Sequence, residues 1–514
     1  MNESGLNLKR ICSKLPYLLL GIILVVVISK KINYHVDEVY SYGLANHKAD
    51  GEKNMTIKNG IKYVPANKPW MDYVTVSKDN KFNYKSVWDN QGVDTHPPLY
   101  YAVLHTICSF FPESFSVWYA GIINIFFSLV SMFMLRKILR LYFENSGGVL
   151  TVASFMFALS PAFVNMATFM RMYVMASCVV LGFTYYFICS IQKKSIGTYV
   201  GIVIMTILGT LTHYYCMFYI VCCSVVYGCF LIFNKRWRDF IKYGFSMLVS
   251  ALLSIAIFPK IIHHLFEGNR GKQALNNASG MEVFLKNIMP MMTRLCREFV
   301  GHYCVAILVL LGVALFLVKQ RKNIRIPNEV RIIFVSLLLY FIVVAAMAPY
   351  SNTRYYYPVY GNLFFVVVFV ITKIILSNRE VYFWICSIGL CMIVFFAWKN
   401  VVWDYLYSDD IVSLEWAQQY FGKDCLIVHS SRFKLYACME EVKYYKSSYF
   451  VNHKNLTTLL EEDSLGGEDF VLIICGIDNI EGALEEVKTL YHNYECISQN
   501  QAQNHVSYYF KYNN

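Results

Sequence analysis

The sequence predicts an all-α polytopic membrane protein with a small C-terminal extracytoplasmic α/β domain, and three observations support this fold class. The chain of 514 residues is 56% hydrophobic and only 16% charged, with a mean hydropathy of +0.41, which is too apolar for an ordinary soluble globule. Apolar runs of spanning length recur over residues 1–400, separated by short Lys and Arg clusters. The composition changes after residue 401.

The N-terminal apolar run, 11–29, is predicted to be an anchoring first span. It continues directly into Lys30 and Lys31 without a small-residue cleavage site, which argues against a removed signal peptide. Basic residues before this run favour a cytoplasmic N-terminus: Lys9, Arg10 and Lys14. The next segment, 34–114, is therefore expected to be a long outer loop.

The run from Pro97 to Phe111 is short for a crossing and contains His105. If it crossed, every later basic cluster would lie outside, so we predict a short helix at or dipping into the outer leaflet. The other spans are expected near 115–135, 149–168, 172–191, 197–211, 215–234, 243–259, 303–318, 331–348, 357–375 and 381–400, which gives about eleven in all. The outer loops then include 260–302, 349–356 and everything after 401.

The C-terminal segment, 401–514, is predicted to be a separate domain after the transmembrane domain 1–400. Cys425–His429 and Phe470–Cys475 are buried-strand runs, and Glu481–Tyr491 has helical spacing. An aromatic run, Val506–Tyr512, suggests a further strand. With no nucleotide-binding glycine loop, the domain is interpreted as a packing or acceptor-guiding appendage.

Charge and cysteine usage restrict the classes of partner. The net charge of +12 comes from clusters between apolar runs rather than one basic face, so no nucleic-acid partner is predicted. The 16 cysteines show no metal-ligand spacing and no disulfide framework, and many lie within apolar spans. No metal and no cofactor is predicted, and whether a divalent ion assists is left open.

An acid pair, Asp37 and Glu38, follows closely after the first span, at the start of the outer loop. Carboxylates there lie where water meets hydrocarbon, since deeper placement costs several kcal/mol. The pair is consistent with work on a lipid-borne substrate, or with simple solvation of a helix end.

The membrane map collects further polar residues on the same outer surface: Asp94, His96, Arg171, Tyr173, His213, Tyr214, Arg354 and Tyr355. Each residue also has a purely structural explanation. An arginine can snorkel to the membrane surface, a histidine can bond to a backbone carbonyl, and tyrosines can form an interfacial belt. An outer arginine such as Arg354 runs against the usual inside placement of positive charge and favours an anionic partner. Together they suggest that a base takes a proton from an acceptor hydroxyl while cations stabilise a lipid-phosphate leaving group.

The order of these motifs resembles GT-C fold membrane glycosyltransferases of family 39, the protein O-mannosyltransferases and bacterial relatives such as the lipid A aminoarabinose transferase. The resemblance covers residues 11–400 and rests on five motifs: Asp37-Glu38, His96-Pro97-Pro98-Leu99-Tyr100-Tyr101, Arg171-Met172-Tyr173, Thr212-His213-Tyr214-Tyr215 and Arg354-Tyr355-Tyr356-Tyr357-Pro358. It implies a polyprenyl-phosphate sugar donor, an active site at the outer membrane surface and an aspartate base in a single inverting displacement.

Carried over by residue, the resemblance makes Asp37 the general base with Glu38 as its catalytic neighbour. His96 matches the motif that closes the loop, and Arg171, His213 and Arg354 match positions near the donor phosphate. Asp94, Tyr173 and Tyr355 complete the expected substrate-binding set. The sequence departs from the eukaryotic protein mannosyltransferases because no outer loop is long enough for their trefoil-like insertion, which favours a bacterial-type enzyme.

The expected activity is therefore that of a multi-pass cell-membrane glycosyltransferase, hexosyl or pentosyl, acting on the extracytoplasmic face. Its partners would be the lipid bilayer, a polyprenyl-phosphate sugar and a protein, lipid or glycan acceptor. The alternative is a transporter or flippase for a lipid-linked or small solute. Transporters usually place critical polar residues near the bilayer midplane in repeated halves, whereas here they gather at one surface.

Overall fold

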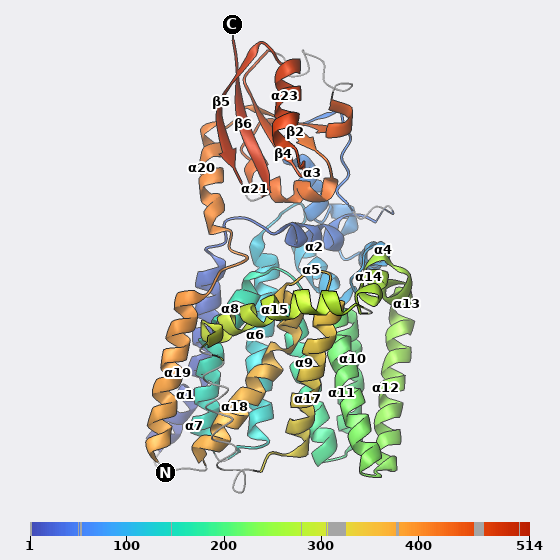
Figure 1. The fold of residues 1–514 in the computed structure, drawn as a ribbon, viewed down its shortest axis with the longest axis vertical. Helices are drawn as coiled ribbons and strands as arrows, with labels where there is room; N and C mark the ends of the chain where they lie inside the picture. Colours follow the sequence, from blue (N-terminus) through green and yellow to red (C-terminus); the bar gives the residue numbers. More distant parts are fainter. Residues whose placement is uncertain are drawn as a thin grey trace. The chain divides into compact units, whose positions relative to one another are not determined.

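The computed structural model describes residues 3–49, 51, 54–144, 146–278, 280–304, 306, 325–376, 380–456, 467–502 and 504–513 (Figure 1). These residues fall into two compact units. We call residues 1–28, 95–100 and 121–403 the membrane unit, and residues 29–94, 101–120 and 404–514 the loop-and-tail unit. The chain passes between the units at the end of the first outer loop, where Asp94 belongs to one and His96 to the other.

The membrane unit is helical throughout its described part. Among the described residues, six helices have the length and composition to cross a membrane, or seven if one bent pair counts as a single span. The helices on the predicted spans run mostly side by side in Figure 1. They are α1 (Glu3–Ile28), α6 (Val117–Arg140, which begins in the other unit), α7 (Gly147–Ala158), α8 (Pro161–Thr168), α9 (Tyr173–Gln192), α10 (Ile196–Thr212), α11 (Tyr214–Phe233), α12 (Trp237–Ile257), α17 (Asn328–Met347), α18 (Tyr360–Leu376) and α19 (Glu380–Asn400).

This architecture confirms the predicted fold class, and each described helix above falls on a predicted span. The expected span at 303–318 lies almost wholly outside the described residues. The expected single span at 149–168 is instead broken, because α7 and α8 meet at a 46° bend. Pro161 is the first residue of α8, and a proline there removes a helical hydrogen bond and clashes with the preceding turn.

The predicted outer loop 260–302 is not irregular but largely helical. It contains α13 (Lys260–Ile262), a π-helical turn (His263–Glu267), α14 (Asn269–Ala278) and α15 (Met281–Val300). Figure 1 shows α15 lying crosswise to the spanning helices of its unit. Its exposed face carries Met281, Leu285 and Met289 at four-residue spacing, the periodicity of an amphipathic helix.

The loop-and-tail unit is built on a six-stranded mixed sheet in the order β1-β3-β2-β4-β6-β5. The predicted strands are confirmed as β2 (Asp424–His429), β4 (Phe470–Cys475) and β6 (His505–Tyr512), and the predicted helix as α23 (Ile480–Leu490). Sequence reasoning missed three strands: β1 (Lys62–Tyr63), β3 (Ser447–Asn452) and β5 (Tyr494–Gln501). The central strands β2 and β4 pair in parallel and are buried along their whole length.

The first outer loop is part of this sheet. Strand β1 comes from that loop and pairs antiparallel with β3 of the tail, with Lys62 opposite Tyr449. Trp70 donates its indole N–H to the carbonyl of Leu435 at 3.0 Å. The loop also contributes α2 (Val36–Asn46), α3 (Lys68–Val74), a 3₁₀ turn (Lys78–Asn80) and α4 (Tyr84–Val93).

The remaining elements of the unit are short. The expected short helix is present as α5 (Leu99–Phe110), whose first residues belong to the membrane unit. In the tail, Ala483 and Val487 of α23 join the core formed by the strands, and Figure 1 shows this helix over one face of the sheet. The other elements in the described part of the tail are α20 (Ile411–Gln419), α21 (Met439–Val442) and 3₁₀ turns at Ser408–Asp410, Arg432–Cys438 and His453–Asn455.

Candidate active site

The acid pair lies in the first turn of α2, where the two carboxylates have different surroundings. His35 caps the helix: its Nδ1 accepts the N–H of Asp37 at 3.0 Å, and its own N–H donates to Glu38 Oε2 at 2.7 Å. This reciprocal arrangement is a capping box, with histidine in the place of the usual serine or threonine. Glu38 is therefore occupied in holding the helix start.

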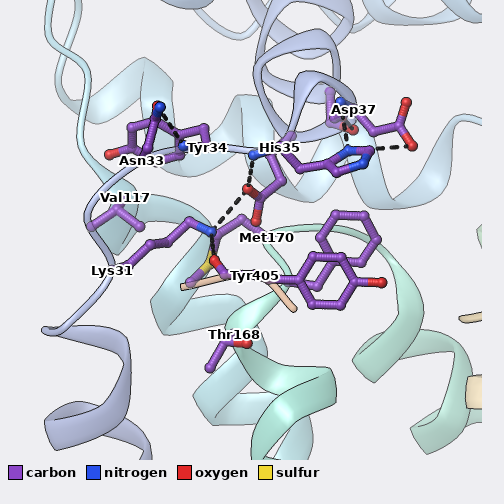
Figure 2. A network of polar contacts seen from close by, with 12 residues as sticks. Lys31, Asn33, Tyr34, His35, Asp37, Val117, Thr168, Met170 and Tyr405 are labelled. Atoms are coloured by element: carbon purple, nitrogen blue, oxygen red, sulfur yellow. Dashed lines mark hydrogen bonds and ion pairs between the residues drawn. The ribbon is translucent and has the colours of Figure 1, made fainter. Parts of the chain in front are cut away.

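Glu38 also forms a buried ion pair. The Lys31 ammonium lies 2.9 Å from Glu38 Oε2, and the two side chains are 1% and 0% exposed. Lys31 donates in addition to the carbonyl oxygen of Tyr405, as Figure 2 shows. Burial lowers the pKa of Lys31, and the adjacent carboxylate opposes that shift.

Asp37 is the more accessible member of the pair. Its side chain is 18% exposed, and Oδ2 lies 3.6 Å from His35 Nδ1. In Figure 2 the Asp37 carboxylate points away from Lys31. A carboxylate in the first turn of a helix is stabilised in its charged form by the helix dipole, the state that a proton acceptor needs.

Asp94 lies at the other end of the first outer loop and is joined to the same helix. Tyr40 of α2 donates its hydroxyl to Asp94 Oδ1 at 3.1 Å, and both residues are buried. Burial, together with the neighbouring Asp94 carboxylate, raises the pKa of Tyr40, so the phenol keeps its proton. Asp94 thus fixes the orientation of α2 within the loop-and-tail unit.

In the membrane unit, Arg171 occupies the turn between α8 and α9, as predicted, and is 2% exposed. Its Nη2 donates to His96 Nε2 at 3.3 Å. The turn is held by Asn124 of α6, whose amide donates to the carbonyls of Ala167 and Phe169 at 3.0 and 2.8 Å. The Phe169 carbonyl also accepts the backbone N–H of Arg171 at 2.7 Å, so Asn124 and the Arg171 backbone hold the turn together.

His213 is the single residue between α10 and α11, so the tight turn predicted there is confirmed. Its ring lies 6.0 Å from that of His96 and 5.2 Å from that of Tyr173. Burial, followed by the electrostatic effect of the neighbouring His96, Arg171 and Arg354, holds the pKa of His213 well below its ordinary value. Because His213 Nδ1 accepts the N–H of Tyr215 at 3.1 Å, the neutral ring carries its proton on Nε2 and can donate there.

Arg354 lies in a short 3₁₀ segment, Thr353–Val359, between α17 and α18. Its guanidinium carbon is 5.5 Å from the ring centre of Tyr355, which in turn lies 5.0 Å from the Tyr215 ring. The segment is anchored by Glu298 of α15, which accepts hydroxyl hydrogen bonds from Thr353 at 3.2 Å and Tyr360 at 2.7 Å. A crosswise helix therefore sets the position of the arginine turn.

Two comparisons with known proteins find matches. A family model described as dolichyl-phosphate-mannose-protein mannosyltransferase matches residues 95–263. Two crystal structures of ArnT from Cupriavidus metallidurans are similar at 10% identity: one bound to undecaprenyl phosphate, with a TM-score of 0.56 and coverage of 99% of this chain and 98% of that chain, and one in the apo state, with a TM-score of 0.55 and coverage of 96% and 97%.

The chain has the GT-C fold. No curated protein matches it significantly. The matched GT-C segment, 95–263, includes His96, Arg171, Tyr173 and His213, whereas the acid pair and Arg354 lie outside it.

Two groups of polar residues lie at opposite ends of the membrane unit. Ring contacts and a hydrogen bond join His96, Arg171, Tyr173, His213 and Tyr355 into one group at the starts of α9 and α11. At the opposite ends of α9 and α6, Glu329 accepts from Gln192 at 2.9 Å and Tyr142 at 3.2 Å. The basic clusters belong to that second end: Arg136, Lys137, Arg140, Lys193, Lys194, Arg236 and Arg238.

The structure therefore gathers the predicted site residues into two groups, one in each unit. Asp37, Glu38 and Asp94 belong to the loop-and-tail unit, and the other predicted residues belong to the membrane unit. Sequence reasoning missed the residues that position them, namely Lys31, Tyr40, Asn124 and Glu298. Among the described residues, no group of three or more His, Cys, Asp and Glu side chains could hold a metal ion.

Proposed function

We propose that this protein is an integral-membrane glycosyltransferase that moves one sugar from a polyprenyl-phosphate donor to an acceptor hydroxyl, with inversion. Asp37 takes the proton of the hydroxyl, the hydroxyl oxygen bonds to the anomeric carbon, and the bond from that carbon to the phosphate oxygen breaks. Polyprenyl phosphate leaves with the electron pair. The proposal is supported by the GT-C fold together with the family match over residues 95–263.

The observation that carries the proposal is the pair of arginines beside His213. Arg171 is buried and Arg354 is half-buried, and both act on His213 at one end of the membrane unit. Guanidinium groups bind phosphate through paired hydrogen bonds, so a phosphate is the kind of ligand that this pair favours. The ArnT relative was crystallised with undecaprenyl phosphate, a ligand of this class.

The second group supplies the base. Asp37 is accessible and lies at a helix start, whereas Glu38 is committed to His35 and Lys31. We therefore assign proton abstraction to Asp37 and positioning to Glu38. Asp94, Tyr173 and Tyr355 are proposed to line the substrate site.

We also propose that the reaction takes place on the extracytoplasmic face of the cell membrane. The basic clusters lie at the end of the membrane unit opposite the His213 group, and positive residues between spans mark the cytoplasmic side. The loop-and-tail unit follows α1 and α19, so the same rule places it outside. The domain that binds the acceptor would then be formed by the first outer loop together with the tail.

The test is mass spectrometry of envelope lipids and glycans from cells with the wild-type protein, without it, and with Asp37→Asn. We expect Asp37→Asn to insert normally, abolish transfer and accumulate the same polyprenyl-phosphate sugar as the deletion. The missing product identifies the sugar and the acceptor. Asp72→Asn is the matched control, since Asp72 is an exposed aspartate of the same loop paired only on the surface with Lys68.

Normal transfer by Asp37→Asn would refute the assigned base. A deletion that redistributes a lipid or solute across the membrane, with Asp37→Asn behaving as wild type, would instead support the transporter alternative. An intact product in the deletion strain would remove the transferase proposal altogether.

A further inference from the structure

We propose that Lys31 is a positioning residue for Asp37, acting through Glu38, and that its charge keeps the Glu38 carboxylate from opposing ionisation of the base. The inference rests on the proposed function, because it takes Asp37 as the base of that reaction. All the contacts that carry it belong to the loop-and-tail unit.

A continuous set of contacts connects Lys31 to the base. The ammonium lies 2.9 Å from Glu38 Oε2, and that oxygen accepts the His35 N–H at 2.7 Å. His35 Nδ1 then accepts the N–H of Asp37 at 3.0 Å (Figure 2). A displaced Glu38 carboxylate would release the His35 backbone and with it the cap that orients Asp37.

Lys31 is also fixed on its other side. Its ammonium donates to the carbonyl of Tyr405 and lies 5.6 Å and 5.5 Å from the ring centres of Tyr34 and Tyr407. Two tyrosine faces and a carbonyl hold the cation in a single place, in contrast to a surface lysine. Residues 404–407 begin the tail part of the unit, so Lys31 joins the tail to the helix that carries the base.

Stability alone does not account for a charged pair in this position. Replacing a buried ion pair by packed apolar side chains is often neutral or stabilising. An electrostatic role gives a reason for the charge: two neighbouring carboxylates make each other harder to ionise, and an ammonium on Glu38 cancels that effect at Asp37.

The other titratable groups around Asp37 do not replace Lys31. His35 accepts at Nδ1 and is neutral in that arrangement. Burial, with Glu38 and Asp37 nearby, raises the pKa of Tyr407, which keeps that phenol neutral. Glu440, which acts on Tyr34, forms its own ion pair with Lys443.

The test is the pH dependence of kcat/KM for Lys31→Met, Glu38→Gln and the double variant. Lys31→Met leaves an unpaired carboxylate beside the base, so the acid limb should move up by about half a pH unit. Glu38→Gln leaves an unpaired ammonium, so the limb should move down by about the same amount. The double variant, with neither charge, should return to the wild-type limb.

The exposed neighbour Lys30 offers a matched control, because Lys30→Met removes the same charge one residue away and should leave the acid limb unchanged. If Lys31→Met does not accumulate as folded protein, the pH profiles of Glu38→Gln and of the double variant still test the inference. An unshifted Glu38→Gln profile, or a shifted profile in the double variant, overturns the inference. Wild-type transfer by Asp37→Asn is a different failure, since it removes the proposed base itself.

Discussion

The loop-and-tail unit contains a buried ion pair whose contribution to stability should depend on pH. His505 Nε2 lies 2.6 Å from Glu441 Oε2, and the side chains are 3% and 2% exposed. Glu441 Oε1 accepts the hydroxyls of Ser507 at 2.6 Å and Tyr445 at 3.0 Å. Changing His505 to Gln keeps a donor near the position of Nε2 and removes only the charge.

The magnitude follows from these contacts. His505→Gln keeps a hydrogen bond to the charged Glu441 and loses only the attraction between the two charges, so it should cost about 1–2 kcal/mol when both partners are charged. Glu441→Ala should cost more, about 3–5 kcal/mol, because it leaves buried partners unsatisfied. The smaller change is the more informative, since its cost should vanish when His505 is neutral.

The direction of the pH dependence is set by the two pKa shifts. Although burial opposes the shift, Glu441 raises the pKa of His505 above 6.5. The contribution of the charged histidine to the free energy of unfolding is therefore full below pH 6.5 and is lost as the pH rises through the pKa of the folded state. Burial again opposes the shift, but His505 and the hydroxyl donors lower the pKa of Glu441 below 4.5. The contribution of the carboxylate to the free energy of unfolding is therefore full above pH 4.5 and is lost as the pH falls through the pKa of the folded state. The cost of His505→Gln should therefore be greatest between pH 4.5 and 6.5.

The assay is urea unfolding of the full chain in detergent, read by pulsed alkylation of Cys425 and mass spectrometry. Cys425 lies in β2 and is fully buried, so it reacts only when the tail opens. Comparing variant and wild type at each pH cancels the thiol's own pH dependence. A cost that is equal at pH 5.5 and at high pH, or larger at high pH, would refute the reasoning.

Two further predictions concern the membrane unit. Arg354→Ala should raise the KM for the donor about 10- to 100-fold, the equivalent of one lost charged hydrogen bond, and leave the KM for the acceptor nearly unchanged. Steady-state kinetics with each substrate varied in turn would check this prediction. An unchanged KM for the donor would argue against a phosphate contact at Arg354. Asn124→Asp keeps the side-chain shape, but a carboxylate cannot donate to the carbonyls of Ala167 and Phe169. Thermal unfolding in detergent should therefore show a free energy of unfolding that is lower by about 2–4 kcal/mol. The kcat/KM should also fall, because the turn that carries Arg171 is displaced. A stable and fully active Asn124→Asp would show that the turn does not depend on that amide.

The helices of the membrane unit were predictable because the signal for a span is local. About twenty apolar residues bounded by charges define one, and no knowledge of neighbouring helices is required. The break at Pro161 was not predicted, although a Ser-Pro step inside an apolar run disfavours a straight helix. The helices within the predicted outer loop 260–302 were not predicted, because the apolar residues of α15 form a stripe on one face and not a continuous run.

The tail strands divide in the same way. β2 and β4 are central and buried on both faces, so their sequences are continuous apolar runs. β5 has alternating exposure, with polar residues such as Gln499 and Glu495, and β1 is only two residues long. Their pairing depends on partners distant in sequence, and no local pattern in the first outer loop indicates that Lys62 lies opposite Tyr449.

The acid pair shows why a motif alone does not assign roles. Asp37 and Glu38 are adjacent carboxylates, and the sequence treats both as catalytic candidates. In the structure the start of α2 gives them different roles. Glu38, three positions after the cap His35, accepts a hydrogen bond from the His35 backbone, and Asp37 does not. The sequence contains the spacing of a capping box, from His35 to Glu38. Histidine is not among the preferred N-cap residues, so the sequence alone does not indicate that box. The carboxylate that the capping geometry leaves accessible is the one to test as the base, and that argument depends only on the local geometry of α2.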